Sequence, residues 1–257
     1  MKILAPRSVF LLASILFAAV PATHAQDQSI WRFWEQQDGL KETFTNSLSL
    51  DREGRIWAVH GEVDKASRLD GYGVELFPMP DRGRIFTSKQ GEVWSKTAKE
   101  FRRLEDGKWV AHSIPQVTGS DILAAIPVAK ERVLVLLKDK ILSYDAANGS
   151  VTILKSIEQS SLGQFVGIIP SMDGGIWVTG TLGIAKLSQI AAQVPRWEEH
   201  LPSGLAISDL REPSESGRGV ITLVGTDVAS KNPRVVRFDR GKWTVIYKEP
   251  SPLSLRA

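Results

Sequence analysis

A four-residue pattern, Gly-x-(Ile/Val)-Trp, constrains the fold of this 257-residue chain more than any other feature. It occurs at residues 54–57, 91–94 and 174–177, and a weaker copy, Gly-Val-Ile-Thr, stands at residues 219–222. Between the second and third copies, the apolar segment Arg132–Leu136 has the same strand character without the Gly or the Trp. A pattern that returns at regular intervals indicates tandem copies of one structural unit.

The interval between copies identifies the unit. The anchor residues are Trp57, Trp94, Leu134, Trp177 and Thr222, and their spacings are 37, 40, 43 and 45 residues. A period of roughly 40 residues is typical of a four-stranded propeller blade. The sequence therefore predicts an all-β protein, a β-propeller of about five four-stranded blades.

Each copy also supplies the other strands of a blade. Apolar segments precede the anchors at residues 47–50, 84–87, 122–126, 165–169 and, less clearly, 205–210. The tripeptide Gly-Lys-Trp recurs at residues 107–109 and 241–243, and Asn148-Gly149 is a favoured hairpin turn because both residues tolerate positive φ. A β-sandwich with coincidental spacing is the alternative fold, and the agreement of five registers favours the propeller.

Gly and Trp have structural roles in this pattern. A Gly in the turn adopts positive φ and lets the chain reverse before the next strand. The Trp that follows is expected to pack between adjacent sheets, because a single blade cannot bury both of its faces. The tryptophans are thus predicted to be core residues and not ligand-binding ones.

The first 25 residues are typical of a secretory signal. Lys2 and Arg7 precede an apolar run from Val9 to Val20, and small residues lead to a cleavage site after Ala25. The mature chain, residues 26–257, has 30 basic and 29 acidic residues and no cysteine. We expect a periplasmic or secreted product with no membrane span after cleavage, no disulfide and no nucleic-acid partner.

Three segments carry a resemblance to a known family. Residues 34–40, residues 46–57 and the run Pro170–Ala185, with its Gly-Thr after the Trp strand, resemble the two-component regulator propeller repeat. The resemblance implies a periplasmic sensor domain of a two-component or hybrid signalling protein. In that family the propeller usually closes at seven blades and precedes an immunoglobulin-like module, a membrane helix and an output domain.

This chain departs from the family plan, since it carries five copies and none of the later modules. Residues 30–34 are expected to form an outer strand, and residues 251–255 resemble the lead-in at residues 46–50. We therefore expect a truncated sensor that forms an open or incompletely closed ring. A complete five-bladed ring is the alternative.

Residues for catalysis are scarce. After signal cleavage only His60, His112 and His200 remain, on different copies, and Gly-x-Ser-x-Gly does not occur. Asp51 and Asp70 each precede a Gly in a turn, where a carboxylate that binds backbone amides is a better interpretation than a calcium site. We expect no catalytic residue, no metal and no cofactor, and hence no enzyme.

Ligands of propellers bind at surface loops that do not contribute to the packed core. These loops precede the inner strands or join the second and third strands, and we expect His60 to be a solvated residue of one of them. The candidate binding residues are Glu42, Thr43, His60, Glu62, Asp64, Thr97 and Thr181. The expected partner is an unidentified small molecule or glycan, or a protein. A propeller lyase or glycan-processing enzyme and a structural interaction platform remain alternative functions.

Overall fold

The computed structural model describes residues 33–79, 83–88, 90–96, 100–114, 117, 122–190, 192 and 195–248. The chain divides into two compact units, Met1–Trp34 and Glu35–Ala257. The predicted signal peptide (residues 1–25), most of the predicted leading strand (30–34), Thr97 and residues 251–255 lie outside the described residues.

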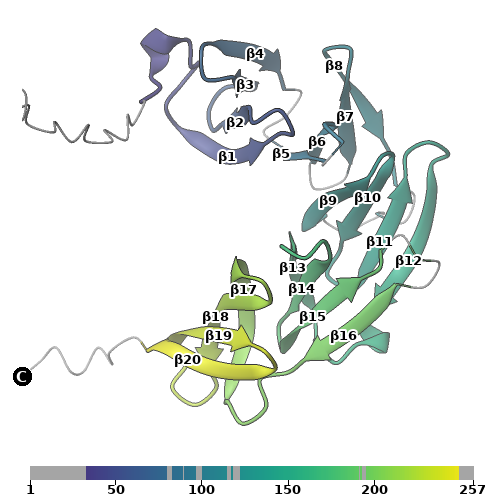
Figure 1. Ribbon diagram of the computed structural model, residues 1–257, viewed down its shortest axis with the longest axis vertical. Coiled ribbons are helices and arrows are strands. Elements are labelled where there is room, and N and C mark those ends of the chain that lie inside the picture. Colours follow the sequence, from purple (N-terminus) through teal and green to yellow (C-terminus); the bar gives the residue numbers. More distant parts are fainter. Residues whose placement is uncertain are drawn as a thin grey trace, which may run out of the picture. The chain divides into compact units, whose positions relative to one another are not determined.

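The described part of the second unit contains five four-stranded antiparallel sheets, numbered here in chain order (Figure 1). Sheet 1 contains β1 (Thr45–Leu50), β2 (Ile56–His60), β3 (Lys65–Leu69) and β4 (Val74–Pro78). Sheet 2 contains β5 (Arg84–Thr87), β6 (Val93–Lys96), β7 (Phe101–Glu105) and β8 (Lys108–His112). Sheet 3 contains β9 (Ala124–Ala129), β10 (Arg132–Leu136), β11 (Lys140–Asp145) and β12 (Ser150–Ser156). Sheet 4 contains β13 (Phe165–Pro170), β14 (Ile176–Gly180), β15 (Gly183–Ser188) and β16 (Arg196–His200). Sheet 5 contains β17 (Ile207–Gly217), β18 (Val220–Asp227), β19 (Pro233–Asp239) and β20 (Lys242–Lys248).

The strands of every sheet follow chain order, and each sheet contacts the next one along the chain. The first strands make these contacts in the series β1–β5, β5–β9, β9–β13 and β13–β17. Within the described residues, no strand of sheet 5 makes more than marginal contact with sheet 1. The predicted all-β architecture of five four-stranded units is confirmed.

The repeated Gly and Trp have the roles that the sequence predicted. Gly54, Gly91 and Gly174 have φ of 79°, 92° and 92°, in the turns that join the first and second strands of their sheets. Trp57 and Trp94 are buried among hydrophobic side chains of sheets 1–2 and 2–3 respectively. Trp177 is buried between sheets 4 and 5. The tryptophans therefore hold neighbouring sheets together.

The outer face of sheet 1 differs from the equivalent faces of the next three sheets. Leu48 lies nine residues before Trp57, and its side chain is 68% exposed. At the equivalent positions of sheets 2, 3 and 4, Ile85, Ala125 and Ile168 are only 3%, 2% and 7% exposed. In those sheets the preceding sheet covers the position, whereas in sheet 1 Leu48 is exposed although Ala58 and Ser67 on the same face are buried.

The hairpin at Asn148-Gly149 differs from its prediction. Gly149 has φ of 70°, but Asn148 does not adopt positive φ, and residues 146–149 form a longer turn that joins β11 to β12. Two residues of positive φ occur instead at Asp106-Gly107 (47° and 77°) and at Arg240-Gly241 (48° and 80°). The two Gly-Lys-Trp tripeptides thus begin in turns of the same kind.

Helices are short where the structure describes them. They are the 3-10 turns η1 (Gln36–Asp38) and η3 (Ile157–Gln159). Over the described ranges, no helix has the length and apolar character needed to cross a bilayer.

Candidate functional site

Two of the loops predicted to bind a ligand meet at one end of sheet 1. The Oε1 atom of Glu42, in the segment before β1, accepts a hydrogen bond from the backbone N–H of Glu62 at 2.8 Å. The N–H of Gly61 donates to the carbonyl oxygen of Phe44 at 3.0 Å. The exposed Phe44 ring lies so close that a Cβ on residue 61 would approach it to 2.1 Å. The structure therefore brings Glu42, His60 and Glu62 into one region.

The prediction that His60 is a solvated loop residue is wrong. His60 is the last residue of β2 and has no exposed surface. Its Nε2 lies 2.6 Å from the Ser67 hydroxyl oxygen, and its Nδ1 is buried without a hydrogen-bond partner among the described residues. Burial lowers the pKa of His60, against an opposing effect of the Glu42 carboxylate. The ring is inside because the strand extends further than the Trp pattern indicated.

The remaining candidates are dispersed. Thr43 and Asp64 are exposed near the same end of sheet 1, and the carbonyl of Asp64 accepts the N–H of Met79 at 2.9 Å. Thr181 follows β14 in sheet 4, where its carbonyl accepts the N–H of Leu210 at 3.2 Å. The predicted residues therefore form a small group in sheet 1 and a separate position in sheet 4.

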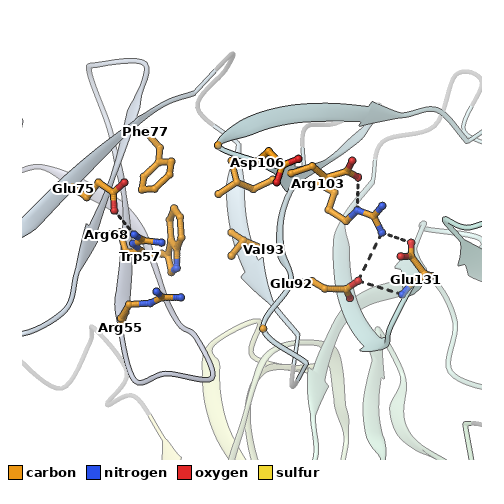
Figure 2. A pocket seen from close by; sticks show the side chains of 14 residues that line it. Arg55, Trp57, Arg68, Glu75, Phe77, Glu92, Val93, Arg103, Asp106 and Glu131 are labelled. Carbon is orange, nitrogen blue, oxygen red and sulfur yellow. Dashed lines mark hydrogen bonds and ion pairs between the residues drawn. The ribbon is translucent and has the colours of Figure 1, made fainter.

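A cavity of about 500 Å³ opens between sheets 1 and 2 (Figure 2). It lies at the strand ends opposite the Glu42 region, because its walls include the β7–β8 turn and the residues just before β2 and β6. Arg55, Arg68, Trp57 and Phe77 line it from sheet 1. Val93, Arg103, Leu104 and Asp106 line it from sheet 2, and Glu131 reaches it from the β9–β10 turn. Sequence reasoning missed this cavity because it favoured the loops at the other end.

A cation stands across the strand pair from each of the three repeated tryptophans. Arg68, Arg103 and Lys186 on the third strands are the cross-strand partners of Trp57, Trp94 and Trp177. The cationic groups lie 5.6, 5.4 and 4.6 Å from the indole centroids. Such cation–π pairs contribute to stability and keep each guanidinium or ammonium group close to the indole ring.

Carboxylates surround the arginines of the cavity. Arg103 pairs with Glu105 at 2.6 Å, with Glu131, and with Glu92 at 3.7 Å. Arg68 pairs with Glu75 across β3 and β4. The cavity is therefore lined by separate groups of paired opposite charges, one around each arginine.

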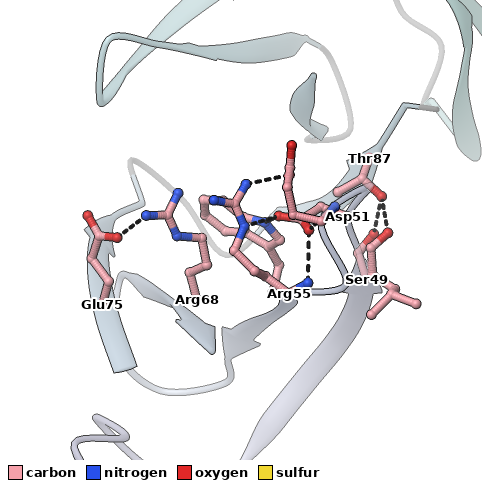
Figure 3. Close-up of polar contacts among 9 residues, drawn as sticks. Ser49, Asp51, Arg55, Arg68, Glu75 and Thr87 are labelled. Carbon is pink, nitrogen blue, oxygen red and sulfur yellow. Dashed lines mark hydrogen bonds and ion pairs between the residues drawn. The ribbon is translucent and has the colours of Figure 1, made fainter. Parts of the chain in front are cut away.

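The Asp51 carboxylate organises the turn beside the cavity (Figure 3). Its Oδ1 accepts the backbone N–H groups of Glu53 (3.1 Å) and Arg55 (2.9 Å). Its Oδ2 accepts Arg55 Nε (2.7 Å) and Trp57 Nε1 (3.1 Å). Burial would raise the pKa of Asp51, but the hydrogen bonds from Arg55 and Trp57 outweigh burial and lower it. Asp51 is thus a turn-stabilising residue, as the sequence predicted.

Two further indoles are bound by carboxylates. Trp197 Nε1 donates to Glu199 at 2.7 Å, and Trp177 Nε1 donates to Glu215 at 3.3 Å. Glu215 belongs to β17, so this hydrogen bond joins sheets 4 and 5. Within the part of the chain that the structure describes, no group of three His, Asp or Glu could hold a metal ion.

His60, which is buried, and His112 and His200, which are half-buried, predict a loss of stability in mild acid. Burial is the main cause that lowers the pKa of His60, His112 and His200 below 6.5. As the pH falls through 6.5, these histidines therefore take up protons in the unfolded chain before they do so in the folded protein. The stability that the neutral histidines contribute is lost progressively from pH 6.5 down to their pKa values in the folded protein. Carboxylates with lowered pKa values, such as Glu215, add a loss only below about pH 4.5. We expect Tm, followed by circular dichroism, to decline between pH 7 and 5. A constant Tm over this range would contradict the assignment.

Known proteins show the fold of this chain. No family model matches the sequence, and no curated protein is similar to it. Virginiamycin B lyase from Staphylococcus aureus is similar in structure, with a TM-score of 0.53 and 14% identity over 80% of this chain and 70% of the lyase. The extracellular domain of the putative hybrid two component system BT3049 from B. thetaiotaomicron has a TM-score of 0.53 and 11% identity. That match covers 88% of this chain but 30% of the other.

A third similar structure is that of YCF48 bound to D1 peptide, with a TM-score of 0.50 and 14% identity over 72% of this chain and 61% of the other. These neighbours are propeller proteins. At such identities they establish the fold class alone, which agrees with the sequence prediction.

Proposed function

We propose that the chain is an extracytoplasmic ligand-binding propeller of a two-component-type sensor, of the two-component regulator propeller repeat family. The repeated residues support the family, and the similarity to the extracellular domain of a hybrid two component system supports the placement. The signal-like first 25 residues support export to the periplasm or the medium. In this proposal the five sheets contribute the sensing part.

The meeting of two loops at the end of sheet 1 carries the proposal of a binding site. The hydrogen bond between Glu42 and Glu62 fixes the loops, and Phe44 presents an exposed ring next to them. Carboxylates accept hydrogen bonds from hydroxyl groups, and an aromatic face packs against the apolar face of a sugar ring. We therefore favour a glycan or another polyhydroxylated small molecule over a protein partner.

Binding is favoured over catalysis because a pair of side chains suited to nucleophilic chemistry, His60 and Ser67, is buried. The 2.6 Å contact between His60 Nε2 and the Ser67 hydroxyl is within the range of a base and a nucleophile, and it is the observation that favours the enzyme alternative. Both side chains have no exposed surface, so a substrate does not reach them. Their contact is better explained as the satisfaction of buried polar groups.

The ring formed by the five sheets is open in this proposal. The lack of any more than marginal contact between the described strands of sheets 1 and 5 supports an open ring, as does the exposure of Leu48 in contrast to its buried equivalent Ile85 in sheet 2. In a closed ring a neighbouring sheet would cover both positions. An open ring leaves an apolar face on which another module could dock.

A glycan microarray probed with residues 26–257 tests the binding function. We expect a discrete set of bound glycans. By titration calorimetry, Phe44→Ala should weaken binding of the best glycan by about tenfold or more, because the ring is the exposed apolar surface of the site. Tyr72→Ala is the matched control, since Tyr72 is an exposed aromatic residue of the same sheet in the β3–β4 turn. Equal losses in both variants would contradict the site, and an array without binders would contradict the ligand class.

A further inference from the structure

The cavity between sheets 1 and 2 carries an excess of negative charge. Five carboxylates line it, from Glu75, Glu92, Glu105, Asp106 and Glu131, against the three guanidinium groups. Each guanidinium is already paired with at least one carboxylate. All three guanidinium groups of the cavity are therefore paired with carboxylates, and the carboxylates that line the cavity outnumber them.

Two acceptors of the cavity have unused capacity. Asp106 is exposed at the rim and has neither an ion pair nor a hydrogen bond within the described ranges. Glu92 accepts the backbone N–H of Glu131 through Oε1 at 3.4 Å, whereas its buried Oε2 has no hydrogen-bond partner among the described residues. A buried carboxylate oxygen without a donor costs free energy, and because the Glu92 side chain as a whole is still 16% exposed, a cation beside it in the cavity would offset its negative charge.

The aromatic rings on the sheet 1 wall of the cavity already bind a cationic group of the protein, the guanidinium of Arg68. The guanidinium of Arg68 lies 5.6 Å from the Trp57 centroid and 5.1 Å from the Phe77 centroid, so it is a cation held on two aromatic rings. On the opposite wall, the half-buried Leu104 adds apolar surface suited to methylene groups, together with the small exposed part of Val93. A volume of about 500 Å³ is within the usual size of small-molecule sites.

We propose that this cavity binds a small organic cation that carries several N–H donors separated by methylene groups, such as a polyamine. Its ammonium groups pair with Asp106 at the rim and Glu92 on the wall, and its methylene groups pack on Val93 and Leu104. This site is distinct from the Glu42–Phe44–Glu62 region at the other end of sheet 1. It goes beyond the proposed sensing function and does not depend on it.

Sheet 5 provides the variants that test the charge assignment. Arg240 and Gly241 occupy the same turn in sheet 5 as Asp106 and Gly107 in sheet 2, with φ values of 48° and 80° against 47° and 77°. Arg at this position is therefore compatible with the turn, and Asp106→Arg should fold. Arg240→Asp is the reciprocal control, because Arg240 does not line the cavity.

Spermidine is the probe, measured by titration calorimetry at low ionic strength. We expect saturable one-site binding to the wild type, a loss of about tenfold or more in Asp106→Arg, and wild-type affinity in Phe44→Ala. Arg240→Asp should also bind with wild-type affinity. Non-specific attraction to net charge would instead strengthen binding to Arg240→Asp.

Several outcomes would overturn the proposal. These are the absence of spermidine binding to the wild type, unchanged binding to Asp106→Arg, and affinities that follow net charge in the two swapped variants. Binding of malate in place of spermidine would show that the charge assignment is reversed. If Asp106→Arg fails to fold by circular dichroism, Asp106→Asn makes the same comparison without the added charge. A silent glycan array with intact spermidine binding would contradict only the proposed sensing function.

Discussion

Replacing Glu215 with alanine should lower the free energy of unfolding by about 1.5–3 kcal/mol, because this one carboxylate accepts hydrogen bonds that join two sheets. Its Oε1 accepts hydrogen bonds from Trp177 Nε1 (3.3 Å), the Ser171 hydroxyl (3.1 Å) and the N–H of Gly219 (2.9 Å). Its Oε2 accepts the N–H of Met172 at 2.7 Å. Burial would raise the pKa of Glu215, but hydrogen bonds from the Gly219 and Met172 amides outweigh burial and lower it. The substitution leaves all four donors without this acceptor.

Urea denaturation followed by tryptophan fluorescence measures this loss. Glu198→Ala is the control, because the exposed Glu198 carboxylate pairs only at the surface with Arg196 (3.2 Å) and His200 (3.8 Å). Such a surface pair contributes less than about 1 kcal/mol. Equal effects of the two substitutions would show that the junction of sheets 4 and 5 does not depend on Glu215.

The second large effect is a difference in stability between alanine substitutions at two equivalent positions, Ile85 in sheet 2 and Leu48 in sheet 1. Ile85→Ala should cost about 2–4 kcal/mol, because Ile85 is 3% exposed and packs in the cluster that contains Trp57 and Val93. Leu48→Ala removes a similar volume at the same position of sheet 1, where the side chain is 68% exposed. We expect it to cost less than about 0.5 kcal/mol.

This pair of variants also tests whether the ring is open. If another surface of the same molecule covered Leu48 in solution, Leu48→Ala would cost as much as Ile85→Ala. A difference of about 2 kcal/mol or more between the two unfolding free energies supports the open arrangement. Matching losses would contradict it.

Local features of the sequence predicted the fold well. The turn glycines and the tryptophans recur at regular intervals along the chain, so the sequence alone predicts the positive φ of Gly54, Gly91 and Gly174. The Asp51 turn was also predictable, because its donors lie within six residues along the chain. Repetition makes such short-range relations visible.

Relations between distant residues were not predictable in this way. The burial of His60 depends on β1 and β3, which pair with its strand, and on the Ser67 hydroxyl. The role of Glu215 depends on Trp177, 38 residues away in the preceding sheet. The cavity requires sheets 1 and 2 to face each other with Arg68 and Arg103 inward, which no single copy of the repeat specifies.

The positions of the carboxylates that bind Trp57 and Trp177 have a consequence for the newly made chain. Trp57 finds its acceptor, Asp51, within its own sheet, so sheet 1 satisfies its indole as soon as residues 45–78 have left the ribosome. The Trp177 indole N–H cannot form its hydrogen bond to a carboxylate until Glu215 has been synthesised. A ribosome stalled between these two residues would therefore present a fourth sheet with an orphaned indole N–H, a species open to proteases and chaperones.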